Sequence, residues 1–211
     1  MDAAETGPGP APGRAGYARS AGSPRGAARR RELLDRVTAD LARNGLPDFS
    51  LRRAARAAGT THKVLLYYFD SADDLLGQAV DQLREQRTAA GLVAASGGPA
   101  SRPLADRVRA VWPILAAAEQ RVLDQAIGLS LYDPGRYGGL GRDSSRQYLP
   151  VLRSICPEHW PAPRKAEVAE LILAAFRGLL IELRISGDAG GVEAGLEALL
   201  RALDREEGAG G

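Results

Sequence analysis

Residues 49–71 have the sequence FSLRRAARAAGTTHKVLLYYFDS, in which two short apolar patterns flank a glycine. Ser50 can cap a helix of about two turns that carries alanines inward, and Gly59 can supply the left-handed residue that ends it. Thr61 can cap another short helix that runs through Tyr68. The inward positions of this second helix are Leu65 and Phe69. Two short helices separated by a glycine turn are typical of a helix-turn-helix.

The residues on either side of this segment predict a longer helix before it and another after it. Ser23 and Pro24 have the pattern of an N-cap followed by a proline at the first helical position. Apolar residues then repeat at helical spacing as far as Asn44. After the segment, Ser71 can cap a long amphipathic helix that we expect to reach about Ala90. The helix-turn-helix is therefore expected to sit between two long helices.

The rest of the sequence predicts further helices, and it has no strand-like alternation and no internal repeat. Segments with helical periodicity are 104–119, interrupted by Pro113, and 121–132, 142–155, 164–186 and 192–205. The glycine-rich stretch 133–141 is expected to be a loop. Residues 164–186 carry apolar side chains on nearly every side, which indicates burial on several faces. The predicted fold class is all-α.

Composition indicates a globular protein and excludes several other classes. Of the 211 residues, 45% are hydrophobic and 26% are charged, which is enough apolar material for a sizeable core. No apolar run is long enough for a membrane span, and no secretory signal precedes the helices, so we expect a cytoplasmic protein. Cys156 has no cysteine partner and is expected to be a small buried side chain. Residues 1–22 lack apolar periodicity and are expected to form a disordered arm.

Charge is distributed unevenly along the chain. Residues 1–70 contain 12 Lys or Arg and 7 Asp or Glu, a net charge of +5, whereas residues 71–211 contain 16 and 19, a net charge of −3. A basic excess at one end is typical of a protein in which one part binds phosphate groups and the other part does not.

The segment from Arg29 to Leu83 closely resembles the DNA-binding region of the TetR family. In that family a hydroxyl residue opens the second helix, Ala-Ala-Gly makes the turn, and the third helix ends in an aromatic pair followed by Phe. The resemblance implies a three-helix DNA-binding domain over 23–70 and a helical effector-binding and dimerisation domain over 71–206. It also implies a homodimeric repressor that a small-molecule effector releases from a palindromic operator in double-stranded DNA.

Candidate DNA contacts follow from the geometry of the major groove, which admits one helix with its N-terminal residues toward the base edges. The outward positions of the predicted third helix and its cap are Thr61, His62, Lys63, Val64, Tyr67 and Tyr68. Lys63 can donate to guanine, His62 to a base or a phosphate, and Val64 can meet a thymine methyl.

Other candidate contacts lie outside the third helix. The resemblance implies that Ser50 and Arg52 lie against the DNA backbone and that Tyr68 contacts a phosphate. Arg29 and its arginine neighbours in the first helix are either further phosphate contacts or a solvated helix face. The sequence departs from the family at Lys63, Leu66 and Ala72, where the family often has Gly or Pro, Tyr, and a phosphate-binding Lys.

Aromatic residues in the C-terminal two thirds are candidates for an effector pocket, and ordinary core packing is the alternative for each of them. The candidate residues are Trp112, Tyr132, Tyr148, Phe176 and Arg177. A homodimer would pair the helices 164–186 and 192–205 with their symmetry mates as a four-helix interface. Two reading helices would then lie about 34 to 36 Å apart, and the effector would act by tilting the fourth helix.

Catalysis and metal binding find little support in the sequence. Ser144 and Ser145 have no nearby histidine, and no phosphate-binding glycine loop precedes a helix. His62 and His159 lie in different predicted domains without further ligands at metal spacing, so we expect no metal and no cofactor. The alternative function is a helical interaction module, or a small helical enzyme, that retains a helix-turn-helix-like segment.

Overall fold

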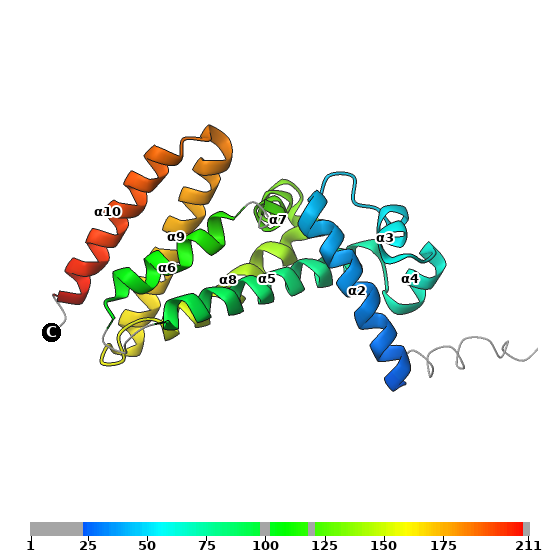
Figure 1. Ribbon diagram of the computed structural model, residues 1–211, viewed down its shortest axis with the longest axis horizontal. Helices are drawn as coiled ribbons and strands as arrows, with labels where there is room; N and C mark the ends of the chain where they lie inside the picture. The colour runs from blue at the N-terminus through cyan, green and yellow to red at the C-terminus, as the bar shows by residue number, and fades with distance from the viewer. Residues whose placement is uncertain (1–22, 98–101, 118–120, 209–211) are drawn as a thin grey trace, which may run out of the picture.

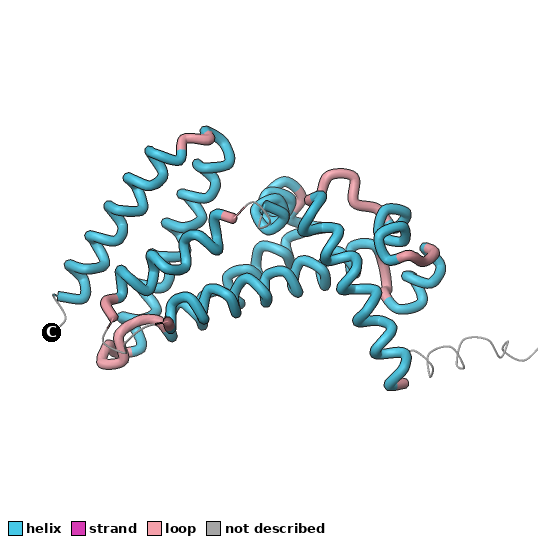
Figure 2. The backbone as a smooth tube through the Cα atoms, viewed as in Figure 1, coloured by secondary structure: helices cyan, strands magenta, loops and turns pink. Residues whose placement is uncertain are grey.

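The computed structural model describes residues 23–97, 102–117 and 121–208, and these residues form nine helices and no strand (Figure 1) (Figure 2). The helices are α2 (Pro24–Asn44), α3 (Leu51–Ala58), α4 (His62–Tyr68), α5 (Ala72–Ser96), α6 (Leu104–Ala116), α7 (Arg121–Tyr132), α8 (Pro134–Ser154), α9 (Ala162–Ser186) and α10 (Ala189–Gly208). The predicted all-α class is confirmed. The predicted arm, residues 1–22, lies outside the described residues.

Helices α2, α3 and α4 begin and end at the residues that the sequence predicts, because the predicted caps form. The Ser23 hydroxyl accepts a hydrogen bond from the Gly26 amide at 3.0 Å, and the Ser71 hydroxyl accepts one from the Asp74 amide at 3.0 Å. Gly59 ends α3 in the left-handed conformation, with φ 63° and ψ 41°. A side chain there would be strained, which is why glycine fits the turn between α3 and α4.

A first hydrophobic cluster holds α2, α3 and α4 against the N-terminal half of α5 and against α7. Leu65 and Phe69 are buried in it, as the sequence predicts, together with Leu33 of α2 and Leu75 of α5. Because α4 has only seven residues, its position depends on this packing rather than on intrinsic helix stability.

A second hydrophobic cluster joins the C-terminal end of α5 with α6, α8, α9 and α10. Helices α9 and α10 form an antiparallel pair at the end of the molecule opposite α3 and α4, and α5 runs between the two ends (Figure 1). Helix α5 therefore contributes residues to both clusters.

Helices α5 and α8 are longer than the sequence predicts, and α9 and α10 also begin two and three residues before their predicted starts. Helix α5 continues past Ala90 to Ser96, because Gly91 and Ala95 are buried where α5 packs against α6. The prediction of a loop over 133–141 is wrong, because α8 starts at Pro134. The Asp133 carboxylate accepts a hydrogen bond from the Arg136 amide at 3.1 Å, so Asp133 is an N-cap followed by proline at the first helical position.

Of the kink or break that the sequence predicts at Pro113, the break does not occur. The helix runs through Pro113 to Ala116, and the proline ring is exposed on its outer side. Water can reach that side and can satisfy the carbonyl that the missing amide leaves without a donor. No helix in the described ranges is long and apolar enough to cross a membrane.

Candidate functional site

The turn between α3 and α4 is held by side-chain caps on both helices. The Ser50 hydroxyl accepts a hydrogen bond from the Arg53 amide at 3.3 Å, and the Thr61 hydroxyl accepts one from the Val64 amide at 3.3 Å. Arg36 of α2 donates to the Ala58 carbonyl at 3.0 Å and so joins the end of α3 to α2. These contacts fix α4 relative to its support.

The N-terminal part of α4 presents polar side chains to solvent. Thr61, His62 and Lys63 are exposed, whereas Leu65 is fully buried. Val64, Tyr67 and Tyr68 are half-buried, and the two tyrosine rings meet edge to face with centroids 4.8 Å apart. The structure thus brings all six predicted contact residues of α4 and its cap to one short helix.

The three predicted contact residues outside α4 lie in different environments. Arg52 and Ser50 are exposed at the start of α3, although the Ser50 hydroxyl is also engaged as the cap. Arg29 forms an ion pair with Glu32 on α2, with 2.6 Å between the charged atoms. Its neighbour Arg30 packs over the Phe69 ring and donates to the Tyr68 carbonyl at 3.2 Å, so it supports α4 from inside.

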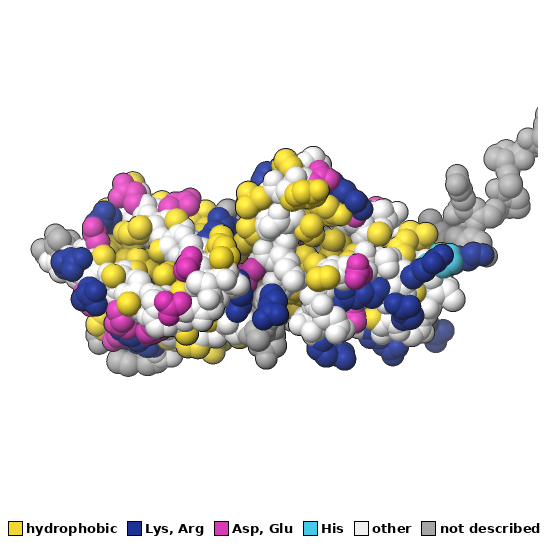
Figure 3. Space-filling view, turned by 90° about the horizontal axis from the view of Figure 1, so that it is seen from above, with side chains coloured by type: hydrophobic (Ala, Val, Ile, Leu, Met, Phe, Trp, Pro, Cys, Tyr) yellow, Lys and Arg dark blue, Asp and Glu magenta, His cyan; other side chains and the backbone are white. Residues whose placement is uncertain are grey.

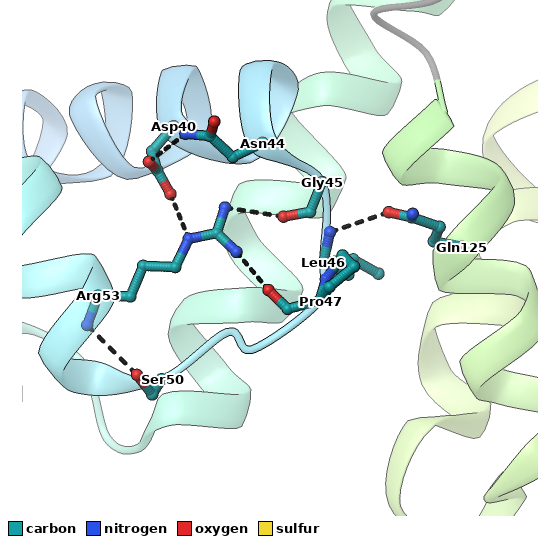
Figure 4. A network of polar contacts seen from close by, with 8 residues as sticks. All are labelled: Asp40, Asn44, Gly45, Leu46, Pro47, Ser50, Arg53 and Gln125. Carbon is teal, nitrogen blue, oxygen red and sulfur yellow. Dashed lines mark hydrogen bonds and ion pairs between the residues drawn. The ribbon is translucent and has the colours of Figure 1, made fainter.

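Arg53 is a structural residue that sequence reasoning missed. Its guanidinium donates to the Asp40 carboxylate at 2.8 Å, to the Pro47 carbonyl at 2.6 Å and to the Gly45 carbonyl at 2.8 Å (Figure 4). The group thereby joins α3 to α2 and to the loop between them. In the same loop, the Leu46 amide donates to the Gln125 side chain of α7 at 2.9 Å.

Positive charge gathers at the end of the molecule formed by α2, α3 and α4. Figure 3 shows Lys and Arg side chains over that end, while Asp and Glu side chains are frequent at the end formed by α9 and α10. The asymmetry along the sequence is therefore also an asymmetry in space.

A cavity of about 290 Å³ lies among α5, α6, α7, α8 and α9, on the side of the molecule away from α4. Tyr148, Phe176 and Arg177 line it. Trp112 is not in its wall but packs against Phe176, with ring centroids 5.7 Å apart. Tyr132 is 89% exposed and lies outside the cavity, because α7 ends there and its last residue points to solvent.

The cavity wall is apolar apart from a few ionisable or hydroxyl groups, of which the sequence prediction missed Arg87 and Asp124. Asp124 forms an ion pair with Arg184 at 3.1 Å. Burial raises the pKa of the Tyr148 hydroxyl, and burial lowers the pKa of the Arg177 guanidinium. A signal for Arg87 was present in the sequence, because it falls on the apolar stripe of α5 one turn after Leu83.

Contacts join the cavity region to the helix-turn-helix end. Helix α5 follows α4 directly and carries Arg87, Thr88, Gly91 and Ala95 into the cavity wall. At its other end, Asp73 forms an ion pair with Arg136 of α8 at 2.7 Å. Within the described parts of the chain, no group of three or more His, Cys, Asp or Glu residues is arranged to hold a metal ion.

Comparison with known proteins identifies the type of fold. No protein-family model and no curated protein sequence matches the chain. Solved structures do match, over most of their length and of this chain. A protein described as a TetR-family transcriptional regulator from Rhodococcus sp. aligns with a TM-score of 0.64 and 16% identity, over 84% of this chain and 97% of that one. The chain has a TetR-like fold.

Two further structures extend the match. A TetR transcriptional regulator from Legionella pneumophila aligns with a TM-score of 0.60 and 18% identity, over 83% of this chain and 95% of that one. The multidrug binding protein EbrR, solved in complex with proflavin, aligns with a TM-score of 0.62 and 18% identity, over 82% and 98% of the two chains. The TetR-like fold therefore includes the α6–α10 region, where the sequence resemblance did not reach.

Proposed function

We propose that this protein is a DNA-binding transcriptional regulator, and not an enzyme, and that α4 lies in the major groove of its operator. The observation that carries the proposal is the exposed N-terminal part of α4, with His62 and Lys63 outward at the basic end of the molecule. A TetR-like fold supports the assignment. We expect the protein to act in the cytoplasm, where its DNA target lies.

In this arrangement each exposed group has a partner of matching chemistry. Lys63 donates to guanine O6 or N7, His62 contacts a base or a phosphate, and Val64 meets a thymine methyl. Tyr67 and Tyr68 direct their hydroxyls toward the phosphates at the groove edge. The Thr61 cap brings the backbone close to the phosphates.

Residues before α4 add contacts that are independent of base sequence. Arg52 and Ser50, at the start of α3, lie against the sugar–phosphate backbone. Arg29 exchanges its exposed carboxylate partner Glu32 for a phosphate, at little cost because exposed ion pairs are weak.

A homodimer on a palindromic operator fits the exposed surface of α9. Five exposed residues of α9 repeat every three or four positions, namely Leu171, Ala174, Gly178, Ile181 and Ile185. They form one stripe along the helix that no other described helix covers. Pairing α9 and α10 with their symmetry mates buries this stripe and sets two copies of α4 about 34 to 36 Å apart.

The cavity is the proposed site of a small-molecule effector that releases the repressor from DNA. EbrR, with the same fold, has been crystallised with proflavin and with imidazole, which supports ligand binding within this architecture. A ligand among α5, α7 and α9 acts on α5, which leads to α4, and the release depends on its different affinity for the two states.

The test is binding of the full chain to DNA that flanks its own coding region, measured by footprinting and fluorescence anisotropy over a range of salt concentrations. We expect a protected palindrome and an affinity that falls steeply with salt. Lys63→Ala should weaken specific binding by about 1–3 kcal/mol. Lys165→Ala is the matched control, because it removes the other lysine, on α9, and should leave binding unchanged.

Absence of any protected site on that DNA, or equal effects of the two lysine variants, would count against the proposal. The protein would then be better described as a helical interaction module that has the same fold.

A further inference from the structure

The cavity contains a buried positive charge, Arg87, that no carboxylate of the described residues neutralises. Arg87 of α5 lines the cavity and is only 5% exposed. Its Nη2 donates to the Leu115 carbonyl at 3.3 Å, and its Nε is buried with no hydrogen-bond acceptor among the described residues. No carboxylate of the described residues lies within ion-pair distance of Arg87. A cation held in this way is costly unless something else supplies the counter-charge.

The neighbouring ionisable groups do not supply a counter-charge to Arg87. Arg84, one turn earlier on α5, has its own partner in Asp81 at 2.8 Å and also donates to the Leu140 carbonyl at 2.9 Å. Asp124 lines the cavity but is paired with Arg184. Arg177 adds a second guanidinium to the wall and has interactions of its own. Arg87 is therefore the cavity guanidinium for which the described residues provide no carboxylate.

A hydroxyl lies near the Arg87 guanidinium. Tyr148 of α8 lines the cavity, and the Arg87 guanidinium lies over its ring, 5.7 Å from the centroid. The Tyr148 hydroxyl is buried with no partner at full hydrogen-bond geometry among the described residues, and the nearby Arg87 guanidinium opposes the rise that burial causes in its pKa, so its O–H hydrogen is still to be donated. It is a donor that an incoming acceptor can use.

The rest of the cavity wall is apolar, and it sets the size and shape of the ligand that can bind. The apolar residues that line the cavity together with Arg87 and Tyr148 include Val111, Leu115, Leu152, Leu173, Phe176 and Leu180. The volume of about 290 Å³ lies at the lower end of the usual range for small-molecule sites, roughly 300–1,000 Å³. Leu131 and Ile181 line the cavity and are exposed in the single chain, so the cavity opens between α7 and α9, at the edge of the α9 stripe that the proposed dimer would bury.

We propose that the cavity binds a small organic acid, whose carboxylate accepts hydrogen bonds from Arg87 and Tyr148 while its aliphatic or aromatic body fills the apolar part. The inference rests on the proposed sensing role of the cavity and gives that role a ligand class. Arg177 adds electrostatic attraction for the carboxylate. A guanidinium and a carboxylate form strong charge-assisted hydrogen bonds, so the acid group fixes both affinity and orientation.

The test measures ligand binding to the full chain without DNA, by calorimetry and by thermal unfolding. The probes are unbranched acids from hexanoate to decanoate together with benzoate and 4-phenylbutanoate, each compared with its primary amide and its primary amine. We expect at least one acid to bind and to raise the unfolding temperature, its amide to bind about tenfold or more weakly, and its amine not to bind. The inference is overturned if no acid binds, or if an amide or amine binds as tightly as its acid.

Arg87→Met tests the residue itself, since methionine keeps much of the length and removes the charge. The acid should then bind about tenfold or more weakly while the affinity of the amide is unchanged. The unliganded variant should unfold at the same or a higher temperature, because an unneutralised buried cation is gone. A marked fall in that temperature would make Arg87 a structural residue and overturn the inference.

Arg109→Met is the matched control, because it removes an arginine that is exposed on α6 and paired with Glu197. It should leave acid binding unchanged. The outcome is independent of the DNA assay: specific DNA binding without acid binding rejects this inference alone, whereas acid binding without specific DNA binding rejects the proposed function.

Discussion

Arg53 shows how much of the helix-turn-helix depends on one largely shielded side chain of α3. Its guanidinium meets one carboxylate and two carbonyls, and both Arg53 and Asp40 are largely shielded from solvent. The adjacent Arg52 and Arg56 are exposed. Three arginines within five residues of one short helix thus have different environments.

Replacing Arg53 with lysine should destabilise the protein although the charge is kept. A single ammonium cannot reproduce the fork that reaches Asp40, Gly45 and Pro47 together, so we expect a loss of about 1–3 kcal/mol in the free energy of unfolding. Urea denaturation followed by circular dichroism measures it. Arg56→Lys, at an exposed position, should change the same quantity by no more than about 0.5 kcal/mol. Equal values for the two variants would refute the role assigned to Arg53.

Sequence reasoning could place the caps but not this guanidinium. Ser50, Gly59 and Thr61 act on backbone groups three or four residues away, so local sequence predicts them. Two of the partners of Arg53 are main-chain carbonyls in a loop, and a carbonyl has no residue-type signature. The unneutralised charge of Arg87 was hidden for a related reason, since it depends on which helices surround α5.

At the scale of elements, α8 is the helix whose first residues local sequence propensity wrongly predicts to be a loop. Four of the eight residues after Pro134 are glycines that favour a loop, namely Gly135, Gly138, Gly139 and Gly141. The cap at Asp133 and close packing against α7 outweigh that preference. A Cβ at Gly141 would lie 2.6 Å from the Ser130 hydroxyl of α7, so glycine allows the two helices to approach.

Gly141→Ala should therefore destabilise the protein, by about 1–3 kcal/mol, because the added methyl group overpacks the contact between α7 and α8. Thermal or urea unfolding measures the change. Gly77→Ala on α5 is the matched control, since nothing lies near the new methyl group there and the gain in helix propensity should stabilise by about 0.5–1 kcal/mol.

Ser130→Ala in the Gly141→Ala background should recover most of the lost stability, because it removes the hydroxyl that the methyl group meets. No recovery, or a Gly141→Ala variant as stable as the unmodified protein, would mean that the close approach is unimportant.

At the scale of the whole molecule, the sequence resemblance anticipated the arrangement of the helix-turn-helix, and apolar periodicity anticipated the number of helices behind it. It could not anticipate where the cavity lies, because residues from five helices form its wall. Tyr132 was a candidate on composition alone, and the structure leaves it in solvent. Trp112 packs against Phe176 and does not line the cavity.

The exposed stripe of α9 predicts a dimer in solution. Sedimentation velocity at micromolar concentration should give twice the chain mass of 22.3 kDa. Ala174→Glu puts a charge in the middle of the stripe and should shift the protein to monomer, since a buried unpaired carboxylate opposes association. Ala89→Glu, at an exposed position of α5 away from the stripe, should leave the dimer intact. A monomeric unmodified protein would exclude the paired geometry on DNA.

The uninterrupted course of α5 has a mechanical consequence. From Asp73 to Arg87 the axis is about 21 Å long, at about 1.5 Å per residue, so α5 is a stiff lever with the cavity at one end. A rotation of about 5° about the cavity end moves the far end by about 2 Å over this length, a large part of the roughly 3.4 Å step between base pairs. If the proposed dimer binds DNA through α4, a ligand in the cavity needs to displace its surroundings only slightly to bring the two copies of α4 out of register with the DNA.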